Sequence, residues 1–502
     1  MLMRRYVLQR KLWSERTNIH WRREAFATTL KPAEKSGELE VDFELELKLD
    51  LSDHCPPSRI SQASWRKSSR EHSNRILEIL SPGLTPLDHP LNTGLQRQRK
   101  QRERNRNAQS LSPKGDPFFD DASIYESIAA LDPKHPVYNF LIEYYGMKGT
   151  KGVRRLMKWP PGMNGSSCPS IEAETMRSGI LLEGATEHDF FTNLHAKGAI
   201  LYAGNENNEG DGDEKLRGVE FSPSRYVYRN QHHPLKVRQH EKDRRIRVNS
   251  NNVGPSRPNG GPLAPFLWYR SLLQRTLNAA PVLHCYGLHE WAMQYQPDVS
   301  SDRKNKDSSS NNNSNNKNAS LPPSSKYQSH LKLRVDQKTL NETVEANTLF
   351  CTHVDAWKFF AKEALLLNRF GSRKHASNSH ETNNTRELPG VDERPEWLLR
   401  SEQPACVHTT MDLLKIALKL GPFCDPNLFC RVLEITVSAR CLDFAASPYD
   451  AQTDYGVEPI FIETDFGRNE YKQRQMELMR RAHPIRKDLL ENYEQFLSVL
   501  CE

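Results

Sequence analysis

The chain has 502 residues, of which 36% are hydrophobic and 26% are charged, and its formal net charge is +7 at pH 7. Its mean hydropathy of -0.75 is too low for the whole length to be packed core. No run of about 18 apolar residues occurs, so the sequence predicts no membrane span.

We expect residues 1–115 to form a mostly disordered, basic and polar arm, because they show no sustained periodicity. Within it, residues 38–51 alternate acidic and apolar side chains and could form one strand. The arginine-rich start of the chain is compatible with an organelle transit segment. Nine cysteines without a C-x-x-C pair fit a reduced compartment. We therefore expect an intracellular protein, either nuclear or cytoplasmic or in an organelle.

Residues 116–502 are expected to form one main core domain, interrupted by polar insertions at about 204–261, 300–325 and 372–389. Each insertion has too few apolar side chains to offset the entropy lost on ordering. Basic residues cluster at 97–106 and 236–247. These segments could bind DNA by neutralising phosphates, or they could simply be solvated.

Several segments of the core domain have the spacing of helices. The first follows Pro136, a residue that the first turn of a helix accepts, and places Val137, Phe140 and Tyr144 on one face. The last runs from Asn469 to about Leu500, with a break expected at Pro484. The segments between them that we expect to be helical are 265–283, 286–295, 409–420 and 426–444.

Alternating side chains predict strands in two places. Leu331, Leu333 and Val335 alternate with polar residues, and the pattern returns near Val344, which predicts a hairpin or small antiparallel sheet ending at His353. Residues 458–464, EPIFIET, predict a further strand. The expected fold class is therefore helix-rich α+β, with a small antiparallel sheet.

His353 and Asp355 lie two residues apart in the aromatic run FCTHVDAWKFF. On a strand, both side chains would project to the same face. His408 could join them from the turn before the next helix, giving two histidines and one carboxylate, a set that binds Fe, Zn or Mn. Alternatively, His353 and Asp355 only make hydrogen bonds at the end of a strand.

His408 and Asp412 are one helical turn apart, so both could bind one ion. Asp412 also follows Thr409 by three residues, which is typical of a capping box at a helix start. His289 and Glu290 form a polar pair in an apolar helix. Residue 293 is a methionine, so the pair does not complete an H-E-x-x-H zinc motif, and His289 fits a site or a buried structural role equally well.

Further charged residues near the C-terminal end are candidates for a polar site. Arg440 and Asp443 are three residues apart on a predicted helix, where an ion pair is expected. Asp450 lies on the loop that follows. Glu463 and Arg468 could hold an anion or pair with each other.

Five blocks between about residues 134 and 490 share a pattern: HPVYNFLIEYY, YGLHEWAMQY, CTHVDAWKFF, EQPACVHTTMDLLKIALKLGPF and RCLDFAASPYD followed by PIFIETDFGRNEY. Together they resemble a family of bacterial and algal or plant proteins often labelled 3-methyladenine DNA glycosylase. The resemblance implies a DNA-repair hydrolase that flips an alkylated base out of the duplex and cleaves its N-glycosidic bond with a carboxylate and a water. The carboxylates at matching positions are Asp355, Asp412, Asp443, Asp450 and Glu463.

Three functions remain open from the sequence. The first is the glycosylase that the resemblance implies. The second is a metal-dependent enzyme acting on a small molecule, with His353, Asp355 and His408 as ligands. The third is a binding protein without catalysis, whose histidines belong to the core.

Overall fold

The computed structural model describes residues 58–85, 129–163, 179–186, 189, 194–195, 199–202, 218–228, 261–283, 285–297, 330–347, 349–370, 372–373, 386–387 and 394–501. Contacts divide the chain into Met1–Asp50 and Leu51–Glu502, and every described residue belongs to the second unit. The predicted strand at 38–51, the basic clusters and the insertion at 300–325 lie outside the described residues.

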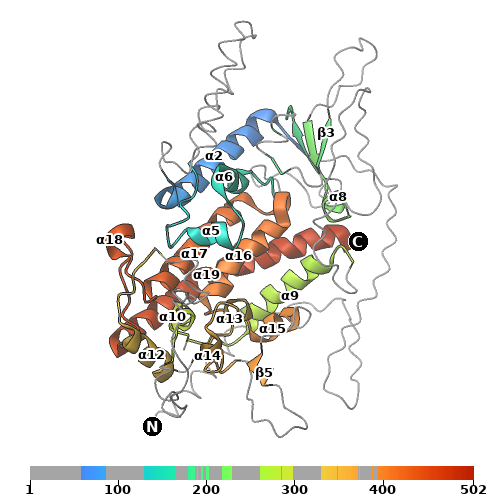
Figure 1. Cartoon of the computed structure of the whole chain (residues 1–502). Helices are drawn as coiled ribbons and strands as arrows, with labels where there is room; N and C mark the ends of the chain where they lie inside the picture. Colours follow the sequence, from blue (N-terminus) through green and yellow to red (C-terminus); the bar gives the residue numbers. More distant parts are fainter. Residues whose placement is uncertain are drawn as a thin grey trace, which may run out of the picture. The chain divides into compact units, whose positions relative to one another are not determined.

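Three helices form the centre of this unit: α16 (Val407–Leu420), α17 (Pro426–Ala445) and α19 (Asp465–Cys501), which pack against one another (Figure 1). Helix α17 buries most of its circumference and leaves only a narrow stripe less buried, which includes Arg431, Glu434 and Cys441. Its start is fixed by Asp425, whose carboxylate accepts a 2.7 Å hydrogen bond from the Leu428 backbone N–H.

Other helices cover the central three. Helix α9 (Ala264–Asn278) packs on α19, and α2 (Gln62–Leu80) packs on α17. The predicted helices at 409–420 and 426–444 are confirmed, whereas the helix predicted at 265–283 ends at Asn278 and the one predicted at 286–295 is limited to His289–Gln294. The remaining described α-helices are α5 (Asn139–Glu143), α6 (Gly149–Met157), α8 (Pro223–Tyr228), α10 (His289–Gln294), α12 (Gln337–Ala346), α13 (Val354–Trp357), α14 (Lys362–Leu365), α15 (Arg394–Ser401) and α18 (Gln452–Tyr455).

The fold is helix-rich α+β, as predicted, but its sheet comes from other segments than those expected. Four strands lie in the order β1 (Ser58–Ile60), β2 (Ile180–Glu183), β4 (Gly218–Phe221) and β3 (Ala199–Tyr202). The sheet is mixed, because β1 pairs with β2 in parallel and the other two pairs are antiparallel. A short antiparallel pair, β5 (Ser372–Arg373) and β6 (Arg386–Glu387), lies within the insertion predicted at 372–389.

The predicted hairpin before His353 was wrong. Helix α12, of 10 residues, occupies the middle of that segment, and Leu333 makes only an isolated bridge to Tyr449. The carboxylate of Asp336 caps α12 by accepting a 2.7 Å hydrogen bond from the Thr339 N–H. Leu340 and Val344, four residues apart, bury one face of this helix, a spacing that outweighs the short alternation before it.

Other element predictions also need correction. Within the expected arm, β1 and α2 are ordered, and α2 buries Trp65, His72 and Ile76 at helical spacing. The predicted insertion at 204–261 contains β4 and α8. Residues 458–464 form turns and no strand.

Helix α19 continues through Pro484, where a break was predicted. Pro484 is exposed, while Ala482 and Ile485 on either side are buried. This packing holds the helix together despite the hydrogen bond that proline removes.

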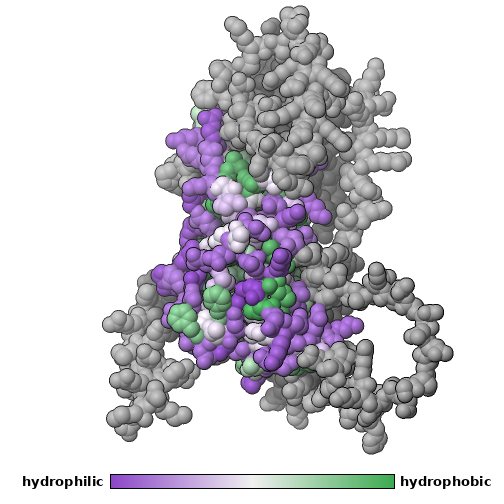
Figure 2. Space-filling model, turned by 60° about the vertical axis from the view of Figure 1, so that its left-hand side comes forward, coloured by the Kyte–Doolittle hydropathy of each residue, from purple (hydrophilic) through white to green (hydrophobic). Residues whose placement is uncertain are grey.

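The surface in Figure 2 is mainly hydrophilic where residues are described, with hydrophobic side chains in small separate groups. The large hydrophobic side chains that are exposed include Phe466 and Phe461 near the start of α19. None of the described helices combines the length and the apolar character that a membrane crossing requires.

Candidate metal centre

His289 begins α10 directly after a tight turn. Tyr286 and Gly287 both have positive φ, and a Cβ at Gly287 would lie 2.9 Å from the Cβ of Ala446. The indole Nε1 of Trp291 donates a 2.7 Å hydrogen bond to the Ala446 carbonyl. The turn and this bond hold the start of α10 against the C-terminal end of α17.

The structure brings His289, His408 and Asp443 together from three different helices. Each offers one metal-ligand atom, these atoms lie within 4.8 Å of one another, and all three residues are buried. The imidazole rings of His289 and His408 are 4.3 Å apart between centroids and nearly perpendicular. His408 lies in the first turn of α16, whereas the sequence placed it in the preceding turn.

Arg440 fixes the carboxylates around this triplet. It donates to Oδ2 of Asp443 at 2.6 Å, as the predicted ion pair requires, and to Oε1 of Glu290 at 2.8 Å. A third bond, from its Nε to the Pro136 carbonyl, anchors the guanidinium group. Because Arg440 occupies Oδ2, the other oxygen of Asp443 is left for a different partner.

Each member of the triplet carries a buried atom with no hydrogen-bond partner among the described residues: Nδ1 of His289, Nδ1 of His408 and Oδ1 of Asp443. Nδ1 of His289 lies 3.3 Å from Oδ1 of Asp443, which is within ion-pair distance but without the geometry of a regular hydrogen bond. Buried polar atoms are rarely left unpaired, because each costs about 1–3 kcal/mol. A cation between the three residues would satisfy all of them.

The two histidines of the triplet have opposite proton affinities. Burial lowers the pKa of His289, but the charges of Asp443 and Glu290 outweigh it and raise the pKa to about 9. Burial, with the neighbouring His289, brings the pKa of His408 well below its usual value. Burial raises the pKa of Asp443, but His289, His408 and Arg440 together bring it below its usual value. A metal ion would therefore displace a proton from His289.

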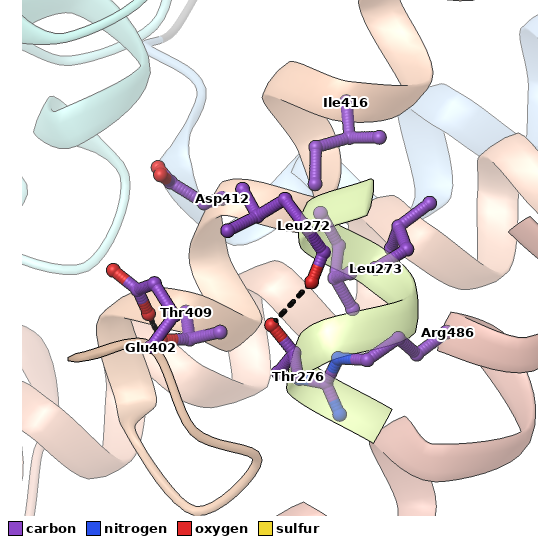
Figure 3. A pocket seen from close by; sticks show the side chains of 9 residues that line it. Leu272, Leu273, Thr276, Glu402, Thr409, Asp412, Ile416 and Arg486 are labelled. Atoms are coloured by element: carbon purple, nitrogen blue, oxygen red, sulfur yellow. Dashed lines mark hydrogen bonds between the residues drawn. The ribbon is translucent and has the colours of Figure 1, made fainter. Parts of the chain in front are cut away.

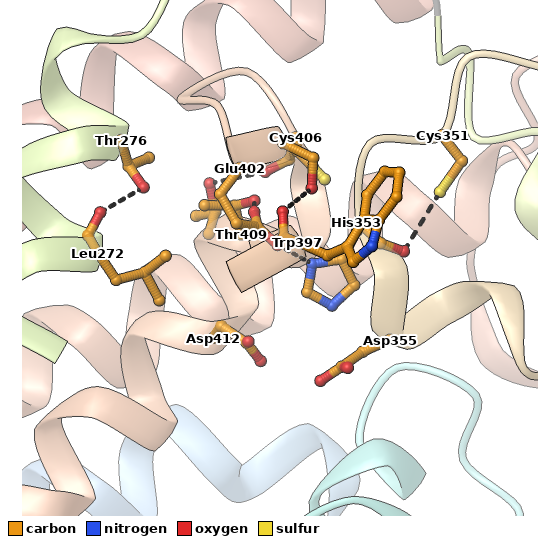
Figure 4. Close-up of polar contacts among 12 residues, drawn as sticks. Leu272, Thr276, Cys351, His353, Asp355, Trp397, Glu402, Cys406, Thr409 and Asp412 are labelled. Carbon is orange, nitrogen blue, oxygen red and sulfur yellow. Dashed lines mark hydrogen bonds and ion pairs between the residues drawn. The ribbon is translucent and has the colours of Figure 1, made fainter. Parts of the chain in front are cut away.

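His353, Asp355 and Asp412 form a second group whose ligand atoms lie within 4.8 Å of one another (Figure 4). The ring of His353 is stacked on that of His408, 5.1 Å away between centroids, so the two groups adjoin. His353 directly precedes α13. The strand that was predicted to end at His353 does not form. Asp412 lies inside α16 and does not cap it, because the helix begins at Val407.

Glu402 locks the orientation of His353. Nδ1 of His353 lies 2.6 Å from Oε1 of Glu402, and since an ionised carboxylate can only accept, the imidazole donates. The second oxygen of Glu402 accepts from the Thr409 hydroxyl (Figure 4). Burial raises the pKa of Glu402, although His353 opposes this effect. Burial lowers the pKa of His353, but the charge of Glu402 outweighs it and raises the pKa to about 9.

Two cations face the carboxylates of the second group. Arg394 donates to Asp355, and Nζ of Lys415 lies 3.8 Å from Asp355 and 3.6 Å from Asp412. Burial raises the pKa of Asp355, but Arg394 and the nearby positive charges bring it below its usual value.

Protein-family models, curated proteins and solved structures were compared with the chain. None matches it. The glycosylase label therefore remains a prediction from the five sequence blocks. The description of the site depends on its geometry.

Glu290 and Arg440 adjoin the first group without belonging to it, and three further predicted candidates contact neither group. Asp450 is exposed. Both oxygens of Glu463 accept from Arg334, one of them at 2.9 Å. Arg468 bonds to Asp465 and to the Ile462 carbonyl, so the expected pair between Glu463 and Arg468 does not form.

A small cavity lies beside Glu402, among α9, α16 and α19 (Figure 3). Its volume of about 10 Å³ is near the smallest that holds one water molecule. Arg486 lines it, and the three guanidinium nitrogens have no hydrogen-bond partner among the described residues. Burial lowers the pKa of Arg486 to about 10, although the charge of Glu402 opposes this.

Sequence reasoning missed Glu402, Thr409, Lys415 and Arg394 as parts of the site. Glu402 lies 49 residues from His353, so no local spacing connects them. The only available signal was Lys415, which follows Asp412 by three residues, a spacing that places both on one helix face.

Proposed function

We propose that the chain is a metal-dependent enzyme acting on a small molecule, with His289, His408 and Asp443 as the metal ligands. The observation that supports this most directly is the set of unpaired buried atoms, one on each of these residues, within a single ligand group. Helix α10 and the consecutive helices α16 and α17 supply them. Nδ1 of His289 and Oδ1 of Asp443 meet only as an ion pair at 3.3 Å, and Nδ1 of His408 has no hydrogen-bond partner among the described residues.

Two imidazoles and one carboxylate suit iron, zinc or manganese and leave coordination positions for water and substrate. The ion would act as a Lewis acid or lower the pKa of a bound water. The protein holds the ligands in place: Arg440 orients the Asp443 carboxylate, and Trp291 fixes the start of α10 beneath His289.

A polar path leads outward from this centre. His408 stacks on His353, and on the far side of His353 lie Asp355 and Asp412. Their side chains are 13% and 24% exposed. Lys415 is 38% exposed at the outer end. We propose that a polar small molecule reaches the centre from this side.

The test is elemental analysis of the purified full chain beside His408→Ala and Asp443→Asn. Close to one iron, zinc or manganese per chain is expected in the wild type, because the three ligands converge on one position. Each variant should lose most of it, since two ligands bind far more weakly than three.

His483→Ala is the matched control, because His483 is exposed on α19 and belongs to neither group. It should keep the wild-type metal content. A wild type without bound metal, even after incubation with each ion, would remove the proposal.

A second candidate is the DNA glycosylase that the sequence blocks suggest. Among its five candidate carboxylates, Asp355 and Asp412 combine partial exposure with nearby cations that could approach a phosphate backbone. This function predicts release of free base from methylated DNA in the presence of a chelator, and its loss in Asp355→Asn. Metal-dependent activity without base release would favour the first proposal.

A further inference from the structure

Only one of the two ring nitrogens of His353 makes a hydrogen bond to another described residue. The residue is 4% exposed, and Nδ1 is bound to Glu402. Among the described residues, Nε2 has no hydrogen-bond partner. In Figure 4 the ring edge opposite Glu402 is directed at the space between Asp355 and Asp412.

The hydrogen bond from His353 to the Glu402 carboxylate is an arrangement that recurs in metal sites. A ligating histidine usually donates its other N–H to a carboxylate, which fixes the tautomer and directs the free lone pair at the metal. Glu402 is 3% exposed and is itself held by the Thr409 hydroxyl, so turning the imidazole would break its hydrogen bond to a carboxylate that is fixed in place.

The three donors come from two elements that hold them rigidly. His353 and Asp355 flank the start of α13, and Asp412 lies in the second turn of α16. Their ligand atoms lie within 4.8 Å of one another. The imidazole of His353, a residue that is 4% exposed, thus directs a nitrogen without a hydrogen-bond partner in the described part of the chain at two carboxylates, of which Arg394 already holds one oxygen.

We infer that His353, Asp355 and Asp412 bind a second divalent cation, adjacent to the His289, His408 and Asp443 centre. This site depends on its own residues, and it can be tested whether or not the first centre binds metal. With one imidazole and two carboxylates it is richer in oxygen than the first, which favours Mn²⁺ over softer ions. Two neighbouring cations suit substrates that present phosphate or carboxylate oxygens.

Arg394 holds one oxygen of Asp355 by a hydrogen bond, and Lys415 is the competitor for the remaining carboxylate oxygens. Its Nζ lies 3.8 Å and 3.6 Å from the two carboxylates, too far for strong hydrogen bonds, and its side chain is 38% exposed. The ammonium group can therefore move into solvent when an ion binds. Removing its charge should strengthen binding, because the two like charges no longer compete.

The experiment measures Mn²⁺ bound to the full chain by equilibrium dialysis, after stripping with a chelator. The wild type is expected to bind two ions. Asp355→Asn and His289→Ala should each bind one, and Lys415→Met should bind the second ion about tenfold more tightly. Circular dichroism of each variant checks that it is folded.

The outcomes separate the two proposals. One ion that is lost in His289→Ala and kept in Asp355→Asn overturns the second site and leaves the first. One ion with the reverse pattern supports the second site and removes the first. No bound ion in the wild type overturns both. Weaker or unchanged binding in Lys415→Met contradicts the second site even if Asp355→Asn does not fold.

Discussion

At the scale of single residues, the charge balance of the centre depends on Arg440. Its side chain is 9% exposed, and it donates hydrogen bonds to both Glu290 and Asp443, which are themselves 5% and 0% exposed. A buried ion pair contributes little net stability, but removing one partner leaves the other charge unsolvated. Here one cation serves two carboxylates.

Replacing Arg440 with methionine should therefore lower the free energy of unfolding by about 3–5 kcal/mol. Chemical denaturation of the wild type and the variant measures this difference in the free energy of unfolding. Arg431→Met on the same helix is the matched control: Arg431 pairs with Asp488, but the two side chains are 44% and 39% exposed, so a loss of about 0–1 kcal/mol is expected. Equal losses in the two variants would contradict a buried role for Arg440.

Residue chemistry in the sequence predicted His289, His353, His408 and Asp443 as candidates, but it could not group them. His353 and His408 were assigned to one ligand set, whereas the structure places them in adjacent groups. The spacing along the chain carries no information about which side chains meet when their helices pack. Glu402 escaped notice for the same reason, because an isolated glutamate between helices resembles any solvated residue.

At the scale of elements, His72 connects α2 to α6 and to the central helix α17. Its Nε2 donates to the Leu156 carbonyl of α6 at 3.2 Å, and the Cys430 thiol of α17 lies 3.6 Å from its Nδ1. Burial lowers the pKa of His72 to about 4. The neutral ring is therefore the form that folds.

The contribution of His72 to stability should be present above pH 6.5 and lost as the pH falls toward 4, because the unfolded chain takes up the proton first. The full loss is about 3 kcal/mol. In His72→Gln, the free energy of unfolding should fall less steeply with decreasing pH in this range than in the wild type. The difference between the two slopes should be about 1.4 kcal/mol per pH unit. Urea denaturation at several pH values measures this slope.

Ser73→Ala serves as the comparison for His72→Gln. It removes a neighbouring hydrogen bond, to the Met157 carbonyl, without removing a group that titrates. Its stability should be lower by a similar amount at every pH. Parallel profiles for the wild type and His72→Gln would show that another group controls acid sensitivity.

The elements themselves were predictable where apolar spacing was long. Helices α9, α16 and α17 extend for 15, 14 and 20 residues, and their patterns leave no alternative. The hairpin prediction was wrong because an alternation of only three residues is a weaker signal than the cap at Asp336 and the helical spacing that follows it. The strands β1 to β4 are three or four residues long, too short to register as alternation.

At the scale of the whole molecule, the chain divides into two units, and both ligand groups lie in Leu51–Glu502. The groups combine residues from α10, α13, α16 and α17, which are all in this unit. Removing residues 1–50 should therefore leave the thermal midpoint and the metal content unchanged. Calorimetry and elemental analysis of the shortened chain measure both, and a midpoint lower by several degrees would show that the first unit supports the second.

Helix α19 packs against α8, α9, α16 and α17, and it buries Tyr471, Tyr493 and Phe496 completely. Its Gln475 donates a 2.7 Å hydrogen bond to the Ala405 carbonyl, just before the helix that carries His408. During synthesis, α16 and α17 leave the ribosome before the helix that covers them. A nascent chain stalled before α19 would therefore present the apolar faces of α16 and α17 to chaperones.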